Sequence, residues 1–234
     1  MEEVLTILGD LDWSPLWISL KTGVVATVLC FFLGVWAARG VLKLGPRPRA
    51  VIDGILTLPM GLPPTVAGFF LLLIFSLRRP FGGWLYDAFD IKVVQSWAGC
   101  VLAASVIAFP LMYRNARAAF EQVDVNLIYA GRTLGMSERA IFWRVVVPAA
   151  GPGVASGTIL TFARALGEYG ATSMLAGNIA GKTGTISQKI AMVIQNGDYL
   201  TAGIWVVIIL VIAFAIVCAM NLISGRHHKN QKRW

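Results

Sequence analysis

The side chains that most often carry chemistry are few in this sequence, and none is spaced as a catalytic or metal-binding group. The two histidines, His227 and His228, lie in a basic C-terminal tail, where we expect solvated side chains. Each of the three cysteines, Cys30, Cys100 and Cys218, stands alone, without a second cysteine or a histidine at a metal-binding spacing. Free cysteine packs as a small apolar side chain, so we predict no catalytic residue and no metal site in this chain.

One segment is close to a phosphate-binding loop in its residue types. Positions 176–183 read AGNIAGKT, which departs from the pattern G-x4-G-K-[ST] at its first residue. In such loops the backbone amides surround the phosphates and the lysine reaches the terminal one, but the loop follows a β-strand. No strand pattern precedes Ala176, so we expect a glycine-rich loop and no nucleotide site.

Three charged residues, Lys21, Asp53 and Arg164, fall inside apolar segments. All three lie close to an expected membrane surface, and we interpret them as side chains that extend their charge to the interface. Arg164 also precedes Glu168 by four residues, so an ion pair along a helix is one role for it. The other possible role of Arg164 is to provide positive potential on the path of an anion, and the sequence leaves both roles open.

The sequence as a whole is that of an integral membrane protein. Of its 234 residues, 57% are hydrophobic and 14% are charged, and the mean hydropathy is +0.71; a soluble domain has about 25% charged residues. The net charge of +8 comes from bases in short loops, which orient a membrane protein, so we exclude nucleic-acid binding and expect contact with lipid. No change of composition marks a second domain, and 1–234 is expected to form a single transmembrane domain.

An α-helix needs about 20 apolar residues to cross a membrane, and five stretches of the chain reach this length. The expected spans are 15–38, 51–77, 93–113, 145–163 and 201–224. The stretch 186–196 is apolar but too short and contains Lys189, so we interpret it as interfacial or re-entrant. The acidic N-terminus has no base before Lys21, unlike a cleaved signal peptide, and we expect the first span to be retained.

Basic residues are concentrated in alternate loops. The loops 39–50 and 114–144 and the tail 225–234 hold most of them, and the positive-inside rule places these segments in the cytoplasm. We therefore predict an external N-terminal tail at 1–14, a cytoplasmic loop at 114–144 and a cytoplasmic basic tail at 225–234. The loop 78–92 is then external, where its aromatic residues are expected at the membrane interface.

The second expected span is interrupted by prolines and glycine near its middle. Each proline removes a backbone donor and clashes with the preceding turn, so the helix must bend or break there. Freed carbonyls need partners other than lipid, and broken helices in transporters often line the transport route. A structural kink against a neighbouring helix is the alternative. The candidate pathway residues are Pro59, Gly61, Pro63, Pro64 and Thr65.

The cytoplasmic loop contains a short segment with the pattern of a surface helix. Leu127, Ala130 and Leu134 recur at positions that share one helix face, Asp124 is placed to cap its N-terminus and Gly135 to end it. A second helix is expected to start at Ser137, with Glu138 near its positive end, and to lead into the fourth span.

This loop resembles the EAA loop of ABC-importer permeases, a coupling helix that docks on the ATPase subunit. Tyr129-Ala130-Gly131 stands where that family has Glu-Ala-Ala, Gly135 matches its glycine, and Val145-x-Val147-Pro148 matches its Ile-x-Leu-Pro. Tyr129 replaces the acidic residue and Gly131 the second alanine, so a charge contact at that point is not expected. The coupling residues implied by the resemblance are Asp124, Leu127, Tyr129, Ala130, Gly131, Arg132, Leu134 and Gly135.

The resemblance extends over nearly the whole chain and is closest to permeases of the molybdate type. The similar segments are 58–68 (LPMGLPPTVAG), 130–135 (AGRTLG) and 163–171 (ARALGEYGA). It implies an all-α integral membrane protein with the type I ABC importer permease fold, with about five transmembrane helices and a cytoplasmic coupling helix. It also places Arg164, Glu168, Tyr169 and Gly170 in an external gate region.

The function implied by the resemblance is ATP-driven import of molybdate or tungstate through a prokaryotic inner membrane, by alternating access. The expected partners are a second copy of the chain, cytoplasmic ATPase subunits and an external oxyanion-binding protein. The chain itself is expected to hold no cofactor and to hydrolyse nothing, since ATP and magnesium bind the ATPase. A sulfate or thiosulfate permease of the same superfamily is the alternative. An ion-coupled secondary transporter fits less well, because no inverted repeat or midmembrane acid is visible.

Overall fold

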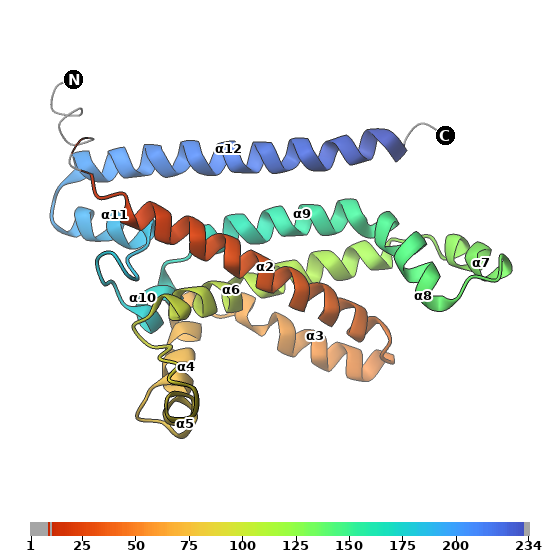
Figure 1. Ribbon diagram of the computed structural model, residues 1–234, viewed down its shortest axis with the longest axis horizontal. Coiled ribbons are helices and arrows are strands. Elements are labelled where there is room, and N and C mark those ends of the chain that lie inside the picture. The colour runs from red at the N-terminus through yellow and green to blue at the C-terminus, as the bar shows by residue number, and fades with distance from the viewer. Residues whose placement is uncertain (1–8, 10, 232–234) are drawn as a thin grey trace.

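The computed structural model describes residue 9 and residues 11–231, with side chains described as far as Leu222. This part of the chain forms helices and connecting loops (Figure 1). In order, the elements are α2 (Ser14–Leu42), α3 (Pro46–Gly61), α4 (Pro64–Phe75), α5 (Pro80–Phe89), α6 (Trp97–Glu121), α7 (Val125–Thr133), α8 (Glu138–Ile141), the π-helix η1 (Phe142–Val146), α9 (Val147–Leu166), α10 (Gly170–Ala176), α11 (Ile186–Gln195) and α12 (Tyr199–Gln231).

Helices α2, α6 and α9 pack together as the centre of the bundle, and α12 lies along α9 (Figure 1). Small side chains line the contact between them, among them Ala26, Ala104 and Ala108, which are fully buried. At Gly34 a Cβ atom would lie 2.9 Å from Met112 Cγ, so only glycine admits this approach of α2 to α6. Close packing of this kind is typical of helices in membranes. Cys30 and Cys100 are buried in the bundle, as expected of packing residues.

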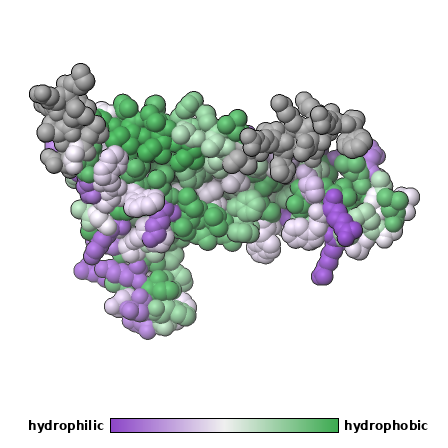
Figure 2. All heavy atoms as spheres, turned by 45° about the horizontal axis from the view of Figure 1, so that its top comes forward, coloured by the Kyte–Doolittle hydropathy of each residue, from purple (hydrophilic) through white to green (hydrophobic). Residues whose placement is uncertain are grey.

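Within the described residues, four helices are long and apolar enough to cross a membrane. They are Ser14–Leu42, Trp97–Glu121, Glu138–Leu166 and Tyr199–Leu222. A broad apolar surface runs along the bundle they form (Figure 2). The fourth expected span was placed at 145–163, but the observed helix begins earlier, at Glu138, so the end of the loop 114–144 and the span are continuous. At the other end of the chain, α12 continues through 225–231 of the predicted basic tail.

The second span is broken where the sequence predicts a break. Helix α3 ends at Gly61, α4 begins at Pro64, and the two axes are bent by 108°. Leu62 is extended (φ −92°, ψ 145°) because a residue before proline is disfavoured in helical geometry. The expected span 51–77 is therefore two helices, and α4 with α5 projects from the side of the bundle (Figure 1).

Helix α11 coincides with the short apolar stretch at 186–196. It has ten residues, too few to cross a membrane, and starts with a capping box between Thr185 and Gln188. The Ile186 N–H donates to Ser19 Oγ at 2.8 Å, which ties the start of α11 to α2. The expected tail 1–14 lies mostly outside the described residues, as do the side chains of His227 and His228.

The segment at 176–183 has no phosphate-binding geometry. The backbone N–H groups of Lys182, Thr183 and Gly184 all point to the carbonyl oxygen of Ile179, at 3.1, 2.9 and 3.1 Å. The Thr183 hydroxyl is fully buried and bonded to the same loop. Because these three donors are already used inside the loop, they cannot surround a phosphate, and the expectation of a glycine-rich loop is confirmed.

Candidate functional site

The loop 114–144 contains the short helix α7 (Val125–Thr133), and its ends have the predicted caps. Asp124 accepts a hydrogen bond from the Asn126 N–H at 2.9 Å. Gly135 has φ 71°, a left-handed geometry that favours glycine after a helix. Ser137 accepts from the Ala140 N–H at 3.3 Å and caps α8. Local sequence therefore determines where α7 begins and where the chain turns back.

Apolar side chains of α7, and of Leu134 directly after it, are uncovered, and Leu127 and Tyr129 lie on opposite sides of the helix. Leu127 is 48% exposed, Tyr129 55% and Leu134 79%, and Ala130 is exposed beside them. Helices α7 and α8 extend beyond the end of the bundle (Figure 1), so these side chains lie away from its core. Exposed apolar patches rimmed by polar residues mark protein interaction sites.

The inner face of α7 is held by α8. Gly131 is buried, and a Cβ atom there would lie 3.1 Å from Ile141 Cγ1, a tight contact. Arg132 Nε donates to Glu138 Oε1 at 2.7 Å, and this bond holds the pKa of the Glu138 carboxyl below its ordinary value. The Arg132 guanidinium also lies 5.9 Å from the centre of the Tyr129 ring. Glycine at 131, where the resembling family has alanine, thus allows α7 to sit close on α8.

Between α8 and α9 the chain makes a π-helical turn, Phe142–Val146, which sequence reasoning missed. No side-chain bond caps this turn, and its residues continue directly into α9. Such insertions in α-helices are frequent at functional sites. The turn connects the exposed loop to α9, which runs through the bundle.

At the opposite end of α9, the break in the second span meets the turn into α10. A Cβ atom on Gly170 would lie 3.0 Å from Pro64 Cβ, and one on Gly68 would lie 2.7 Å from Ala171 Cα. These glycines let α4 and α10 pack backbone to backbone. The structure therefore brings Pro64 and Thr65 next to Gly170, although about 100 residues separate them in the sequence.

Glu168 is the buried charge of this corner. It is 3% exposed, accepts from Arg164 Nη1 at 2.8 Å and from the Ala171 N–H at 2.8 Å. The predicted pair between Arg164 and Glu168 is confirmed, and the carboxylate also caps α10, which sequence reasoning missed. Arg164 is 36% exposed and Tyr169 43%.

The remaining pathway candidates lie on the other side of the break. Pro59 is inside α3 and Gly61 is its last residue, while Pro63 precedes α4. Arg114 of α6 approaches the neighbouring Met60, with Nη1 at 4.0 Å from Sδ. The break itself is observed, and lining of a transport route by these residues stays a prediction.

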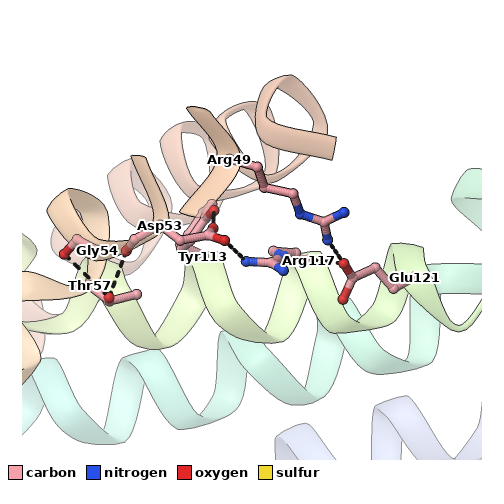
Figure 3. Close-up of polar contacts among 7 residues, drawn as sticks. All are labelled: Arg49, Asp53, Gly54, Thr57, Tyr113, Arg117 and Glu121. Carbon is pink, nitrogen blue, oxygen red and sulfur yellow. Dashed lines mark hydrogen bonds and ion pairs between the residues drawn. The ribbon is translucent and has the colours of Figure 1, made fainter. Parts of the chain in front are cut away.

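Asp53 was interpreted as a side chain that extends its charge to the membrane interface, and the structure shows that its carboxylate is paired within the protein. Its carboxylate accepts hydrogen bonds from the Tyr113 hydroxyl and from Arg117, both on α6 (Figure 3). Arg117 also lies 3.3 Å from Glu121, which pairs with Arg49. The network joins the first half of α3 to the second half of α6. In the sequence, the sign of this network is that Tyr113, Arg117 and Glu121 recur every four residues and so share one helix face.

Replacing Arg117 by methionine is expected to loosen α3 from α6. The side chains of Arg117 and Asp53 are 26% and 20% exposed, so the pair is only partly screened, and we expect a loss of about 1 kcal/mol of unfolding free energy. A double-mutant cycle with Asp53→Asn, measured by thermal unfolding of the purified protein, isolates the coupling. Arg47→Met, an exposed arginine of α3, is the control. A coupling energy of zero would contradict the network.

Comparison with known families decides what kind of membrane protein carries this arrangement. Residues 30–227 match the family described as binding-protein-dependent transport system inner membrane component. The chain belongs to this family. As an inner membrane component of such a system, it is a multi-pass permease subunit, and the resemblance seen in the sequence is confirmed.

Several relatives of this inner membrane component are similar over most of their length. The molybdenum transport system permease protein ModB of Escherichia coli K12 is 41% identical over 190 residues, 81% of this chain and 83% of the relative. The putative molybdenum transport system permease protein YvgM of Bacillus subtilis 168 is 36% identical, covering 88% and 90%. The sulfate transport system permease protein CysT of E. coli K12 is 30% identical, covering 94% and 83%.

Solved structures confirm the fold of this inner membrane component. A bacterial ABC transporter involved in import of the polysaccharide alginate matches with a TM-score of 0.77 at 15% identity, covering 96% of this chain and 83% of that one. The inward-facing MetNI methionine ABC transporter matches with a TM-score of 0.69 at 18% identity, covering 91% and 94%. The type I ABC importer permease fold expected from the sequence is the fold observed.

Proposed function

We propose that the chain is the membrane-spanning subunit of an ATP-driven importer that carries molybdate, or the similar tungstate, into the cell. The observation that carries this proposal is the 41% identity to a molybdenum transport permease over 81% of the chain. The sulfate permease is a more distant relative, at 30%. Sulfate is therefore the second candidate cargo.

In this proposal the chain moves the substrate and its partners supply the energy. ATP and magnesium bind the cytoplasmic ATPase subunits, and the chain itself holds no cofactor. The exposed apolar residues of α7 and the residue after it, Leu127, Tyr129 and Leu134, form the docking surface for one ATPase subunit. A second copy of the chain completes the pathway, and an external binding protein delivers the oxyanion. The N-terminus lies outside and the loop 114–144 in the cytoplasm, as the distribution of basic residues supports.

The coupling proposed between the two ends is mechanical. Residues Glu138–Leu166 form a continuous helical segment of 29 residues, about 43 Å long at 1.5 Å per residue. One end contacts α7 through Ile141, and the other leads into Glu168 and the corner where α10 meets α4. When ATP draws the ATPase subunits together, movement of α7 is transmitted along this helix to the corner, which opens or closes the external side.

Reconstitution tests the proposal directly. The chain is placed in liposomes with its ATPase and binding protein, and uptake of labelled molybdate, tungstate and sulfate is measured with and without ATP. We expect uptake that needs ATP and the binding protein and favours molybdate or tungstate. A preference for sulfate would change the cargo. Uptake driven by an ion gradient without ATP, by a chain that purifies without an ATPase, would make it a secondary transporter.

A further inference from the structure

A basic cavity lies where the end of α2 meets the coupling segment. It has a volume of about 570 Å³, and its charged lining residues are Arg39 of α2, Lys43 directly after α2, and Arg132, Glu138 and Arg139 of the loop. Four of these five side chains are cationic, and the single acid is already bonded to Arg132. Among the described residues, Arg39, Lys43 and Arg139 form no ion pair. The cavity therefore presents an uncompensated positive charge.

An apolar groove adjoins this cavity. It is lined by Phe32, Val35 and Trp36 of α2, by Trp143 of η1 and by Gly151 of α9, and has a volume of about 570 Å³. Its polar lining is slight, and its aromatic side chains are largely exposed, Trp36 at 77% and Trp143 at 66%. The groove runs along α2 and α9, two of the helices long and apolar enough to cross a membrane.

The two hollows share the residues Arg39 and Phe142. The Arg39 guanidinium lies over the Phe142 ring, 3.3 Å from its centre, so it stands between the charged cavity and the apolar groove. A ligand that fits both must have an anionic end and a long apolar end. Basic pockets between transmembrane helices at the cytoplasmic side are known to bind anionic lipid head groups.

We propose that this composite site binds an anionic glycerophospholipid, with the phosphate head group in the basic cavity and an acyl chain in the groove. The proposal rests on the orientation given under the proposed function, because anionic lipids face these bases only from the cytoplasmic leaflet. The head group would contact α2 and the loop that holds α7 at the same time. Lipid composition would then act on the position of the coupling helix.

The test measures lipid retention by the purified complex of permease and ATPase. The complex is equilibrated with micelles that contain equal amounts of phosphatidylglycerol and phosphatidylcholine, and bound lipid is quantified by mass spectrometry. Each base near an anionic surface contributes about fivefold in affinity. We therefore expect Lys43→Gln to lower retention of phosphatidylglycerol about fivefold, and Arg39→Gln with Lys43→Gln about 25-fold. Retention of phosphatidylcholine should not change.

Two further variants separate charge from shape. Arg47→Gln removes a base from the same basic loop but lines neither hollow, and we expect no change in retention. At Gly151 a Cβ atom would meet nothing within 4 Å, so Gly151→Phe fills the groove without a backbone clash. It should reduce retention of both lipids. Thermal unfolding checks that each variant is folded. If the variant with Arg39→Gln does not fold, Lys43→Gln alone tests the charge, because Lys43 is exposed.

Three results would overturn the lipid site. The first is equal retention of the two lipids by the unaltered complex, and the second is unchanged retention of phosphatidylglycerol by the Lys43→Gln variant. The third is a variant of either hollow that loses the ATPase or the second copy while its lipid retention is unchanged, which would assign the hollows to a protein contact. Uptake of molybdate is measured in parallel. Failed uptake with selective lipid retention would count against the proposed function alone. Normal uptake without selective lipid retention would count against the lipid site alone.

Discussion

Replacing Leu134 by aspartate is expected to abolish ATP-dependent uptake while leaving the permease folded. The Leu134 side chain is 79% exposed, so a carboxylate there costs the isolated chain little. At a docking surface the same change removes an apolar contact and buries an unpaired charge. Central interface positions typically contribute 2 kcal/mol or more, which corresponds to an affinity for the ATPase about thirtyfold lower.

The measurements are co-purification of the ATPase and uptake in liposomes, with thermal unfolding as the check on folding. Gln122→Asp introduces the same charge at another exposed position of the cytoplasmic loop, next to the end of α6, and should leave both unchanged. Full co-purification and full uptake with aspartate at 134 would show that the exposed apolar residues of α7 and Leu134 do not form the docking surface.

Replacing Glu168 by alanine is expected to produce the largest loss of stability. The change leaves the Ala171 N–H of the buried corner without its acceptor and Arg164 without its partner. Hydrogen bonds to a charged group contribute about 1.5–3 kcal/mol each. Because Arg164 is 36% exposed and regains water, we expect a total loss of about 2–3 kcal/mol. For a chain of this size that lowers the melting temperature by about 4–12 °C.

Two conservative variants decide between the roles open to Arg164. Glu168→Gln keeps an acceptor for Ala171 but removes the charge, and should recover about half of the lost stability. If Arg164 serves only its ion pair, Arg164→Gln should lower stability and uptake together, in the same proportion as Glu168→Gln. If it attracts the passing anion, Arg164→Gln should weaken uptake most at low oxyanion concentration. Unchanged melting of the Glu168→Ala variant would contradict the role of Glu168 as the cap of α10.

Features set by neighbouring residues were predictable from the sequence. Asp124, Gly135 and Ser137 delimit α7 and α8 because caps and left-handed turns depend on a few adjacent residues. The break at Leu62 follows from two consecutive prolines in the same way. The pair of Arg164 with Glu168 is likewise a contact within one helical turn.

Features that depend on distant residues were not predictable. The partners of Asp53 are Tyr113 and Arg117, which lie 60 and 64 positions further along the chain. The contact of Gly68 with Ala171 and the bend of 108° depend on how α4 packs on α10. A periodic pattern identifies the faces of a helix but not the helix that each face meets, so the contacts of Asp53 with α6 could not be predicted from it.

The π-helical turn at Phe142–Val146 has a consequence for the direction of the docking surface. Each residue turns an α-helix by about 100°, so one additional residue in the turn shifts the angular phase between α8 and α9 by that amount. Ile141 meets Gly131 only in this phase, and α7 is seated through that contact. With a regular α-helix at η1, Leu134 would face another direction around the axis of α9. It would then point away from the position at which we propose that the ATPase binds.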